Sequence, residues 1–444
     1  MDIITGLEIK KIAMGGMGLG FHDNKAIFVP FTAVGDLVDV ELSHSKKDHA
    51  FARVVNYTSR GRGVRDPGCE AFGGEAACGG CDWLMVDYPT QLEYKNALVK
   101  DLFKHQHAET EIYQIVASES QQHYRNKVFM PVGEEHYGIY ARYSHQIIAH
   151  QACQNHPPIF DEIARLCYEL CKLARVQIYN EADHSGSLRH IGLRCNRDQS
   201  QILVILVTRS ARLPFSHTIV RGLTSRFPQI VGIVQNINRD KSNVILGQDH
   251  KLLFGQDYLD DLLCNLRFKI NYRSFWQVNS GTMENILATM RAKLKKGARV
   301  IDAYCGIGAI GLGLSDSIAE LLGIEEVSEA VQDARNNAQM NGVDHARFLH
   351  GRTEQILGTV LKDFSADCII LDPPRSGVQE SALWAIRAAN IPEILYLSCS
   401  PMSLARDLKV LLGDDKYSLE SISSFDMFPN TWHIECLAHL KLQK

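Results

Sequence analysis

The sequence predicts an α/β protein that ends in a doubly wound parallel sheet, and three observations indicate this class. Segments typical of strands and helices alternate from residue 298 onward. A glycine-rich loop, Cys305–Gly311, follows the first of these strands. Short runs typical of a small β-barrel occupy the segment 1–60. Regular alternation favours a parallel sheet with helices on both faces, and the barrel adds a separate all-β unit.

Length and composition bound the organisation of the chain. With about 150 residues per domain as a guide, 444 residues suggest roughly three domains, which we place at 1–60, 61–265 and 266–444. Hydrophobic residues make up 45% and charged residues 22%, as in ordinary globular proteins. The net charge of −4 does not by itself indicate nucleic-acid binding, although a local basic face is compatible with it.

The sequence also predicts a cellular compartment. The first residues lack the apolar core of a signal peptide, and no run of about 18 apolar residues occurs. Twelve cysteines in a chain without such a signal indicate thiols or metal ligands rather than disulfides. We therefore expect a cytoplasmic protein that does not cross a membrane.

Residues 7–57 contain five short alternating runs, LEIKKIA, MGLGFH, AIFVP, LVDVELS and AFARVVNY. Five strands separated by turn residues are typical of an OB-like barrel, a common platform for nucleic acids. Cations and one aromatic residue accompany the last run and follow it: Arg53, Tyr57, Arg60, Arg62 and Arg65. These residues fit an RNA-binding face and a solvated loop equally well.

Three cysteines, Cys69, Cys78 and Cys81, lie close together in the sequence, and the last two flank a Gly-Gly pair. The glycines allow backbone N–H groups to turn towards charged sulfur atoms. A metal site needs a fourth ligand, for which Cys153 is the best candidate. The spacing fits a four-cysteine iron–sulfur cluster and a four-cysteine zinc site equally well. Three further cysteines are expected to pack in a core: Cys167, Cys171 and Cys195.

The region from residue 82 to 265 is predicted to be mixed α/β. A polar helix, TQLEYKNALVKDLFKHQ, precedes strand-like runs such as KVFMPVG, QILVILVT and IVGIVQNIN. Cations and an aromatic ring lie near the ends of such runs, namely Tyr124, Arg125, Asn126, Lys127, Arg189, His190 and Arg194. Mixtures of this kind grip single-stranded RNA, but a surface strand with scattered cations has the same composition.

Three segments near the carboxyl terminus carry reactive groups at strand ends. Asp372 follows the run DCIIL, and Cys399 follows the run EILYLS. Open α/β sheets place their active sites at the carboxyl ends of the strands. If the penultimate strand is parallel to these strands, the final strand starts at the same edge and brings Glu435 to it. The three residues then form a constellation for nucleophilic catalysis by the thiol.

The loop Cys305–Gly311 contains the pattern G-x-G-x-x-G after a strand, and Glu325 ends the next strand. This combination satisfies the fingerprint of a dinucleotide site, so a nicotinamide-dependent oxidoreductase fits the loop. The same kind of loop holds the methionine part of S-adenosylmethionine in methyltransferases. Asp302 before the loop and Asp372-Pro373-Pro374 after the fourth strand favour the methyl donor.

The motifs CGGC, YRNKVFMPV, SFWQVN, DAYCGIG, LDPPRSG, LSCSP and FPNTWHIE follow one another along the chain. In this order they resemble the RNA uracil-5-methyltransferases of bacteria, specifically the branch with an N-terminal TRAM domain and a 4Fe-4S cluster. The resemblance implies a Rossmann-like class I methyltransferase domain, an OB-like TRAM barrel, and a central α+β domain with the cluster and RNA-binding residues.

By this similarity, specific residues acquire expected roles. The 4Fe-4S cluster, rather than zinc, would be held by Cys69, Cys78, Cys81 and Cys153. The methyl donor S-adenosylmethionine would contact Gln277, Tyr304, Glu325 and Asp372. The nucleophile that adds to carbon-6 of uracil would be Cys399, and the base that removes the carbon-5 proton would be Glu435.

The barrel and the cluster favour ribosomal RNA, specifically 23S, as the substrate, because tRNA-specific bacterial relatives typically lack both. This is an analogy with one branch of the family, and transfer RNA is the alternative. A monomer is expected. Two other classes stay open: a nicotinamide-dependent oxidoreductase, and a non-catalytic iron–sulfur protein that binds RNA.

Four features depart from the family pattern. Ser400 and Ser403 replace an Asn and a Thr after the nucleophile, and both keep a hydrogen-bonding group. Ala309 replaces an Asn of the cofactor loop, which would remove one contact to the methyl donor. The spacing between Cys69 and Cys78 is longer than usual, so a bulged loop is expected there. None of these changes removes a reacting group.

Overall fold

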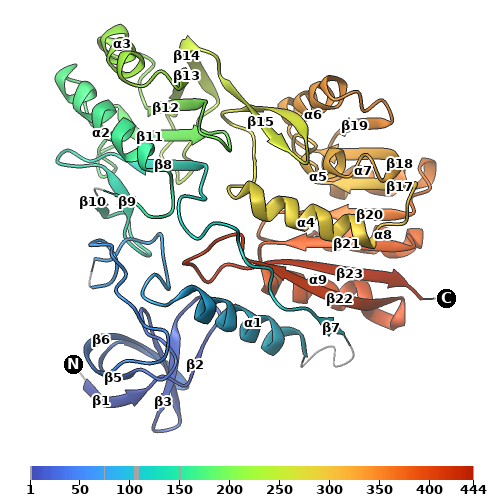
Figure 1. Ribbon diagram of the computed structural model, residues 1–444, viewed down its shortest axis with the longest axis horizontal. Coiled ribbons are helices and arrows are strands. Elements are labelled where there is room, and N and C mark those ends of the chain that lie inside the picture. The colour runs from blue at the N-terminus through green and yellow to red at the C-terminus, as the bar shows by residue number, and fades with distance from the viewer. Residues whose placement is uncertain (1–2, 75, 105–109, 150–151, 444) are drawn as a thin grey trace.

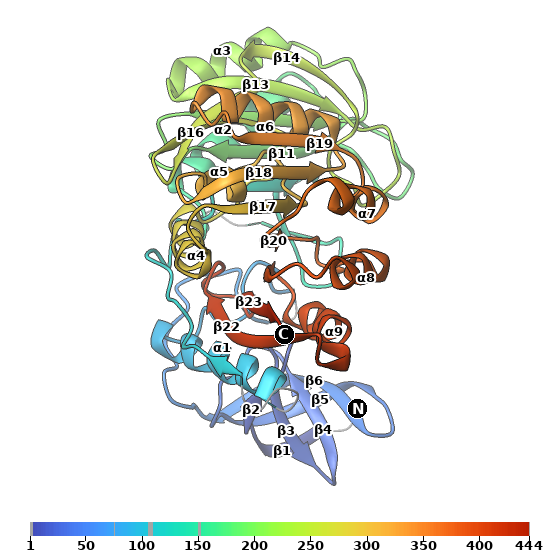
Figure 2. The ribbon, with the colours of Figure 1, turned by 90° about the vertical axis from the view of Figure 1, so that its right-hand side faces the viewer.

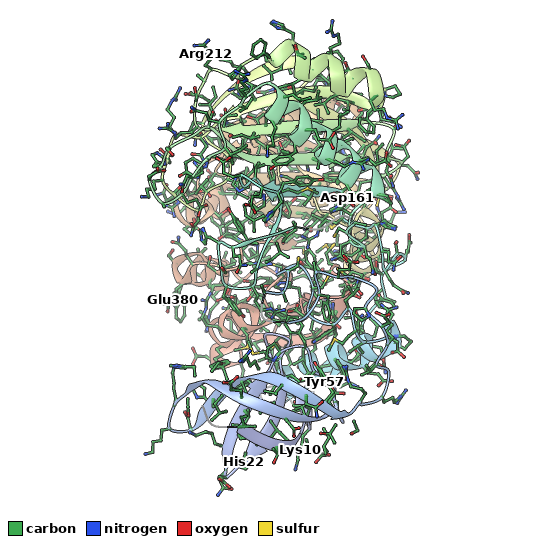
Figure 3. The ribbon with its side chains drawn as sticks, turned by 90° about the vertical axis from the view of Figure 1, so that its left-hand side faces the viewer. Lys10, His22, Tyr57, Asp161, Arg212 and Glu380 are labelled. Atoms are coloured by element: carbon green, nitrogen blue, oxygen red, sulfur yellow. The ribbon has the colours of Figure 1, made fainter. Side chains whose placement is uncertain are left out.

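Three large sheets organise the computed structural model, which describes residues 3–74, 76–104, 110–149 and 152–443. Figure 1 shows the amino-terminal sheet at one end, the central sheet at the other, and the carboxyl-terminal sheet beside them. In Figure 3, Lys10 and His22 lie at the amino-terminal end of the molecule, and Arg212 lies at the opposite end. Strands and helices both contribute, so the α/β class predicted from the sequence is confirmed.

The amino-terminal sheet contains the strands β1 (Ile3–Glu8), β2 (Lys11–Ile12), β3 (Gly18–His22), β4 (Lys25–Val29), β5 (Leu37–Ser45) and β6 (His49–Ser59). Their order is β1-β5-β6-β4-β3-β2. The sequence predicts five strands here, and the described residues from Ile3 onward form six. The reason is that the first run changes partner within its length, since β1 pairs with β5 and β2 pairs with β3.

The cysteine-bearing segment, described at residues 60–74 and 76–87, contains little regular structure. Trp83 anchors it, because this buried indole donates from Nε1 to the Gly16 carbonyl at 2.9 Å. An isolated β-bridge joins Cys78 to Ala141. The segment is therefore attached both to the amino-terminal part and to the central region. The helix that follows it is α1 (Tyr88–Lys104).

The central sheet contains the strands β8 (Lys127–Pro131), β11 (Leu188–Cys195), β12 (Ile202–Thr208), β13 (Ile230–Ile237) and β14 (Asp249–Gly255), in the order β14-β13-β12-β11-β8. Two helices pack on one face, α2 (Pro158–Leu173) and α3 (Ser216–Arg226). Two hairpins accompany the sheet, β9 (Gly138–Tyr140) with β10 (Ile147–Ala149), and β15 (Tyr258–Leu263) with β16 (Leu266–Asn271).

The carboxyl-terminal sheet has eight strands among the described residues: β7 (Glu111–Ile112), β17 (Ala298–Ala303), β18 (Ile318–Glu325), β19 (Ala346–His350), β20 (Cys368–Leu371), β21 (Glu393–Ser398), β22 (Tyr417–Phe425) and β23 (Glu435–Leu442). Their order is β19-β18-β17-β20-β21-β23-β22-β7. The first five of that order are mutually parallel, and β23 is antiparallel to both its neighbours. This confirms the doubly wound parallel sheet with a closing antiparallel strand.

Helices cover both faces of this sheet, as Figure 2 shows. One face packs against α4 (Ser280–Lys293), α5 (Ala309–Gly313) and α6 (Ser328–Met340). The other packs against α1 and against α7 (Thr353–Asp363), α8 (Glu380–Ala389) and α9 (Pro401–Leu412). Burial on both faces explains the continuous apolar runs of the parallel strands. A helix both long and apolar enough to cross a membrane does not occur in the described part of the chain.

Among the connections between the amino-terminal half and the carboxyl-terminal sheet are a pair of strands and a loop. β7 pairs in parallel with β22 at the edge of the sheet. The connection between β22 and β23 occupies residues 426–434, longer than the turn predicted at Pro429-Asn430. It is longer because it makes contacts outside its own hairpin: the Asn430 N–H donates to Gln91 Oε1 of α1 at 2.9 Å.

Candidate active site

A cleft opens at the carboxyl edge of the eight-stranded sheet, next to the point where the strand order reverses between β17 and β20. Open α/β sheets bind ligands at this switch point. The cleft has a volume of about 560 Å³. Its lining includes all six residues that the sequence assigns to the methyl donor or to the reaction: Gln277, Tyr304, Glu325, Asp372, Cys399 and Glu435.

The chain turns sharply after β17 to form the glycine-rich loop. Tyr304 and Gly308 both adopt left-handed conformations, with φ of 66° and 82°. Asp302 is buried, and its Oδ2 accepts the Gly311 N–H at 2.9 Å, which ties the loop to α5. Burial raises the pKa of Asp302 to about 7. A carboxyl group inside the sheet therefore holds the shape of the loop.

Glu325, at the end of β18, closes the same loop from the other side. Its Oε2 accepts the Gly306 N–H at 3.0 Å, and its Oε1 accepts the Val327 N–H at 2.8 Å. Each carboxylate oxygen has a second lone pair, so Glu325 can also accept hydroxyl groups of a ligand in the cleft that it lines. An acidic residue at this strand end is the usual partner of ribose hydroxyls in doubly wound sheets.

Tyr304 and Gln277 bound the cleft, and each is held by a hydrogen bond. The Tyr304 hydroxyl donates to Glu354 Oε1 at 2.9 Å. The Gln277 carbonyl accepts from Asn126 Nδ2 at 3.0 Å. Because Asn126 directly precedes β8, this bond links the wall of the cleft to the central sheet.

The groups predicted to react meet at the ends of neighbouring strands. Asp372 follows β20, Cys399 follows β21, and Glu435 begins β23. The register pairs Ser398 with Cys436, so Cys399 and Glu435 are the next residues on two adjacent strands. β22 runs parallel to β21, which is the condition for Glu435 to reach this edge, and β23 therefore starts at the carboxyl edge.

Burial raises the pKa of each of these groups. The pKa of Glu435, which is 2% exposed, rises to about 8, and the nearby Asp372 carboxyl adds to the rise. Burial alone raises the pKa of Asp372 to about 7. The pKa of the Cys399 thiol rises to about 11, through burial first and the Glu435 carboxylate second.

Arg375 also lines the cleft, and the sequence assigns it neither to the methyl donor nor to the reaction. It shares this cleft with Cys399 and Glu435, and its charge lowers the pKa of both. The guanidinium group thus opposes burial and favours the thiolate, the nucleophilic form. The sequence places the run Asp372–Arg375 opposite Cys399, at the same edge of the sheet, but it gives Arg375 no role of its own.

The residues that depart from the family pattern hold the turn after Cys399. The Ser400 side chain caps α9 by accepting the Ser403 N–H at 3.3 Å. The two hydroxyl groups hydrogen-bond each other at 2.9 Å, and Ser403 Oγ donates to the Arg375 carbonyl at 2.7 Å. The substitutions therefore keep this loop tied to α9. The third departure, Ala309, is the first residue of α5 and offers no polar group.

The four predicted cluster ligands all lie on loops: Cys69, Cys78, Cys81 and Cys153. Gln154 donates to the Gly68 carbonyl at 2.8 Å, which brings the chain beside Cys153 against the chain beside Cys69. Two donors reach sulfur atoms: the Gly80 N–H lies 3.4 Å from Cys78 Sγ, and Asn155 Nδ2 lies 3.1 Å from Cys81 Sγ.

The thiols also influence one another electrostatically. Burial raises the pKa of Cys69, Cys78 and Cys81, and the Cys153 thiol raises all three further. Within the described residues, however, no group of three or more His, Cys, Asp or Glu side chains is arranged to hold a metal ion. The remaining cysteines of the central region are buried in its core, as expected of packing residues: Cys167, Cys171 and Cys195.

The cysteine site contacts the connection that leads to Glu435. Asn155 Oδ1 accepts from Asn430 Nδ2 at 3.1 Å. Asp82, next to Cys81, accepts the Trp432 N–H on its Oδ2 at 3.0 Å. The loops beside Cys81 and Cys153 are thus each hydrogen-bonded to the loop that precedes Glu435.

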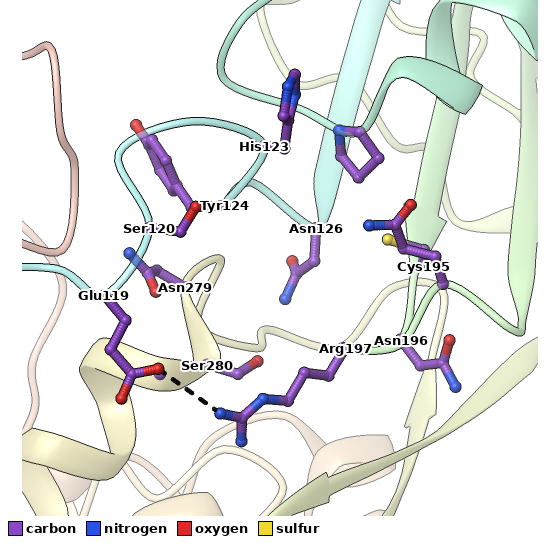
Figure 4. Close-up of a pocket in the computed structure, with 13 residues that line it drawn as sticks. Glu119, Ser120, His123, Tyr124, Asn126, Cys195, Asn196, Arg197, Asn279 and Ser280 are labelled. Carbon is purple, nitrogen blue, oxygen red and sulfur yellow. Dashed lines mark ion pairs between the residues drawn. The ribbon is translucent and has the colours of Figure 1, made fainter.

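A second pocket, of about 170 Å³, borders Asn126, and Figure 4 shows its lining. Arg197 reaches across it towards Glu119, at 4.0 Å, and forms a closer ion pair with Glu284, at 2.7 Å. The pocket is lined by Cys195 but by none of the residues predicted for the cofactors or the reaction. Arg197 is paired with acidic side chains, and the residues predicted for the methyl donor and the reaction line the larger cleft instead.

Known proteins resemble the whole chain. The family model described as tRNA (uracil-5-)-methyltransferase matches residues 206–443. An uncharacterised RNA methyltransferase of Clostridium tetani is 36% identical over 98% of this chain and 94% of its own length. Another, of Oceanobacillus iheyensis, is 33% identical over 99% of this chain and 97% of its own length.

A solved structure supports the fold over the same extent. The crystal structure of Pyrococcus abyssi tRNA (uracil-54, C5)-methyltransferase in complex with S-adenosyl-L-homocysteine has a TM-score of 0.78 with this chain. The match covers 98% of this chain and 100% of that one, at 24% identity. Because the family model spans more than half of the chain and both bacterial relatives align with nearly all of it, the chain belongs to the RNA uracil-5-methyltransferase family and is an S-adenosylmethionine-dependent enzyme.

Proposed function

We propose that the protein methylates carbon-5 of one uridine in 23S ribosomal RNA, with Cys399 as the covalent nucleophile and Glu435 as the base. One observation carries this proposal: a thiol and a carboxyl group stand at the ends of paired strands and line one cleft. Membership in the family removes the nicotinamide-dependent and the non-catalytic interpretations of the sequence.

The chemistry requires a nucleophile because carbon-5 of uracil is a weak one. The Cys399 thiolate adds to carbon-6, and the electron pair of the ring double bond moves into an enolate. Carbon-5 then takes the methyl group from the sulfonium of S-adenosylmethionine, which leaves as S-adenosylhomocysteine. The charge of Arg375 favours the thiolate that this step needs.

The second half of the reaction restores the ring. Glu435 removes the proton from carbon-5, the electrons of that C–H bond re-form the double bond, and the bond from carbon-6 to Cys399 breaks with its electron pair returning to sulfur. A carboxyl group with a pKa of about 8 is a stronger base than an exposed glutamate and suits this proton transfer.

The methyl donor is assigned to the part of the cleft that lies away from Cys399. Glu325 is proposed to accept its ribose hydroxyls, and Asp372, Tyr304 and Gln277 to contact the rest of the molecule. The uracil enters from the side of Cys399. Since a stacked base cannot bring carbon-6 to the thiol, the target uridine must be unpaired or flipped out of its helix.

The cysteines are proposed to hold a 4Fe-4S cluster. Support comes from the donor set: the Cys153 thiol acts electrostatically on the other three thiols, and a backbone N–H and an amide Nδ2 are directed at two of the sulfur atoms. Thiolates bound to a cluster accept hydrogen bonds of this type. We assign the cluster a structural task, since Asn155 and Asp82 link its surroundings to residues 426–434.

We propose three domains along the chain. Residues 1–60 form the OB-like TRAM domain, 61–265 the central domain that carries the cluster, and 266–444 the methyltransferase domain. We expect a monomer in the cytoplasm, where both the RNA and the methyl donor are present. The rRNA assignment rests on the branch that combines a TRAM domain with a cluster.

A second candidate substrate is transfer RNA. The description of the matching family model favours it, and so does the named activity of the Pyrococcus abyssi enzyme. Mapping 5-methyluridine in 23S ribosomal RNA and in tRNA, from cells with and without this gene, decides between the two. Loss of one 5-methyluridine from 23S RNA supports the proposal, and a loss confined to tRNA replaces it with the second candidate.

A further inference from the structure

Lys95 of α1 is a fully buried cation next to the catalytic sheet. Its side chain and that of Asp426 are both 0% exposed. The ammonium group donates to Asp426 Oδ1 at 2.6 Å, to the Phe428 carbonyl at 3.1 Å and to the His433 carbonyl at 2.9 Å. Lysine has three N–H donors, so all of them are used on one loop, residues 426–434.

The three acceptors lie on both limbs of that loop. Asp426 directly follows β22, and His433 lies two residues before Glu435, the first residue of β23. Phe425 and Glu435 form the last residue pair of the two strands. The ammonium group therefore links the two limbs of the loop just beyond the end of the β-ladder, where the strands no longer pair with each other.

We propose that Lys95 is a positioning residue, which fixes the Glu435 carboxylate opposite Cys399 by tying the two limbs of residues 426–434 together. The inference rests on the proposed function, in which Glu435 removes the carbon-5 proton. Lys95 acts through the backbone of the loop and does not touch the uracil. A displacement of about 1 Å in a catalytic group can slow its step by as much as about 10²-fold.

The formation and the breakdown of the covalent adduct depend on different supports. Cys399 stands between β21 and α9, where Ser400 and Ser403 hold the turn. The bonds of Lys95 go to the other loop, the one that carries Glu435 into β23. Loss of Lys95 should therefore spare the attack on carbon-6 and slow the later removal of the proton.

The test compares Lys95→Met/Asp426→Asn with Asp426→Asn and with Lys104→Met. The double variant removes both buried charges, because a lone Asp426 carboxylate in this site would destabilise the fold by itself. Asp426→Asn keeps the two carbonyl bonds of Lys95. Lys104→Met is the matched control, since Lys104 is an exposed lysine at the end of the same helix.

Two readouts separate the steps. Transcribed 23S ribosomal RNA with uridine tritiated at carbon-5 reports proton removal as tritium release, and a denaturing gel reports the covalent adduct. For the double variant we expect adduct formation within about twofold of wild type and tritium release slowed at least about tenfold, with unchanged affinity for S-adenosylmethionine. Lys104→Met should release tritium at the wild-type rate. Asp426→Asn leaves the buried Lys95 ammonium without its countercharge but keeps its two carbonyl bonds, so its rate should fall between those of wild type and the double variant.

The outcomes distinguish this inference from the proposed function. If the double variant releases tritium as fast as wild type while Glu435→Gln traps the adduct, the inference about Lys95 is wrong and the function stands. If Cys399→Ala still methylates RNA and Glu435→Gln traps no adduct, the proposed function fails. If circular dichroism shows that the double variant is unfolded, Lys95→Gln/Asp426→Asn takes its place and must show the same slowing.

Discussion

The reactive groups of the cleft stand at the ends of β20, β21 and β23, whereas the four cysteines stand on loops. In the cleft, backbone ladders place each side chain, and a residue's position in the register fixes what it faces. In the cysteine site, individual hydrogen bonds from Gln154 and Asn155 join separate segments. A site built on strands has its shape before its ligand binds. The shape of a site built on loops depends more on the group that it binds.

The sharpest test of the strand-built site is Cys399→Ala. Since the variant removes one reacting atom from a rigid edge, methylation should fall by more than about 10³-fold. Affinity for S-adenosylmethionine should not change, because the scaffold around the loop after β17 stays intact. Tritium transfer from the labelled methyl donor and equilibrium binding measure the two quantities.

A matched control for this variant is Cys436→Ala. Cys436 is the next residue after Glu435 and is buried in the core, so its loss should leave turnover near normal. Near-normal methylation by Cys399→Ala itself would refute the role of the thiol.

Glu435→Gln tests the second reacting group on the same edge. General-base catalysis contributes typically about 10²–10⁴-fold, so turnover should slow by that order. Because the attack by Cys399 is retained, a covalent protein–RNA adduct should accumulate and be visible on a denaturing gel. A variant with neither a slower turnover nor an adduct contradicts the assignment of the base.

The loop-built site is tested by Cys81→Ser. If the four thiols hold an iron–sulfur cluster, the purified variant should contain little iron and melt at a lower temperature, while it still binds S-adenosylmethionine. Cys171→Ser, a change in the core of α2, is the control that should keep its iron. Full iron content in Cys81→Ser would show that the loops do not form the proposed site.

The smallest expected effect is a pH dependence of stability. Burial raises the pKa of Glu435 from 4.5 to about 8, so the folded state holds this proton where the unfolded state has lost it. The free energy of unfolding therefore decreases as the pH rises through this range. Glu435→Gln lacks this contribution, and its melting temperature relative to wild type should be higher at pH 8 than at pH 5. Parallel melting profiles would contradict the raised pKa.

The sequence predicts the strand-built site well because its residues follow apolar runs. The position of Asp372 and Cys399 at one edge follows from alternation and strand direction, whereas Glu435 is reached mainly through the family resemblance, with strand direction in support. Lys95 could not be predicted in this way, since its partner Asp426 is remote in sequence and a helical lysine is normally exposed. The length of the connection 426–434 is unpredictable for the same reason, because its partners also lie far away along the chain.

The amino-terminal sheet shows a different limit. Its alternating runs predict strands, but not the point at which a run changes partner, as between β1 and β2. Residue type alone proposes Cys153 as the fourth ligand, and the bond between Gln154 and Gly68 shows how the chain brings it near Cys69. A contact of this kind depends on loop conformation, which periodicity does not describe.

The pairing of β7 with β22 bears on the order in which the chain folds during synthesis. Residues 111–112 complete the edge of a sheet whose other strands are all translated much later. Lys95 likewise stays without its carboxylate until residue 426 has left the ribosome. The amino-terminal sheet has its last strand complete at Ser59 and can form early. The sheet of the methyltransferase part cannot be completed until its last strand has been synthesised. A nascent chain that stops before residue 426 therefore exposes an unpaired strand edge, and Lys95, which is buried in the folded protein, stays in contact with solvent.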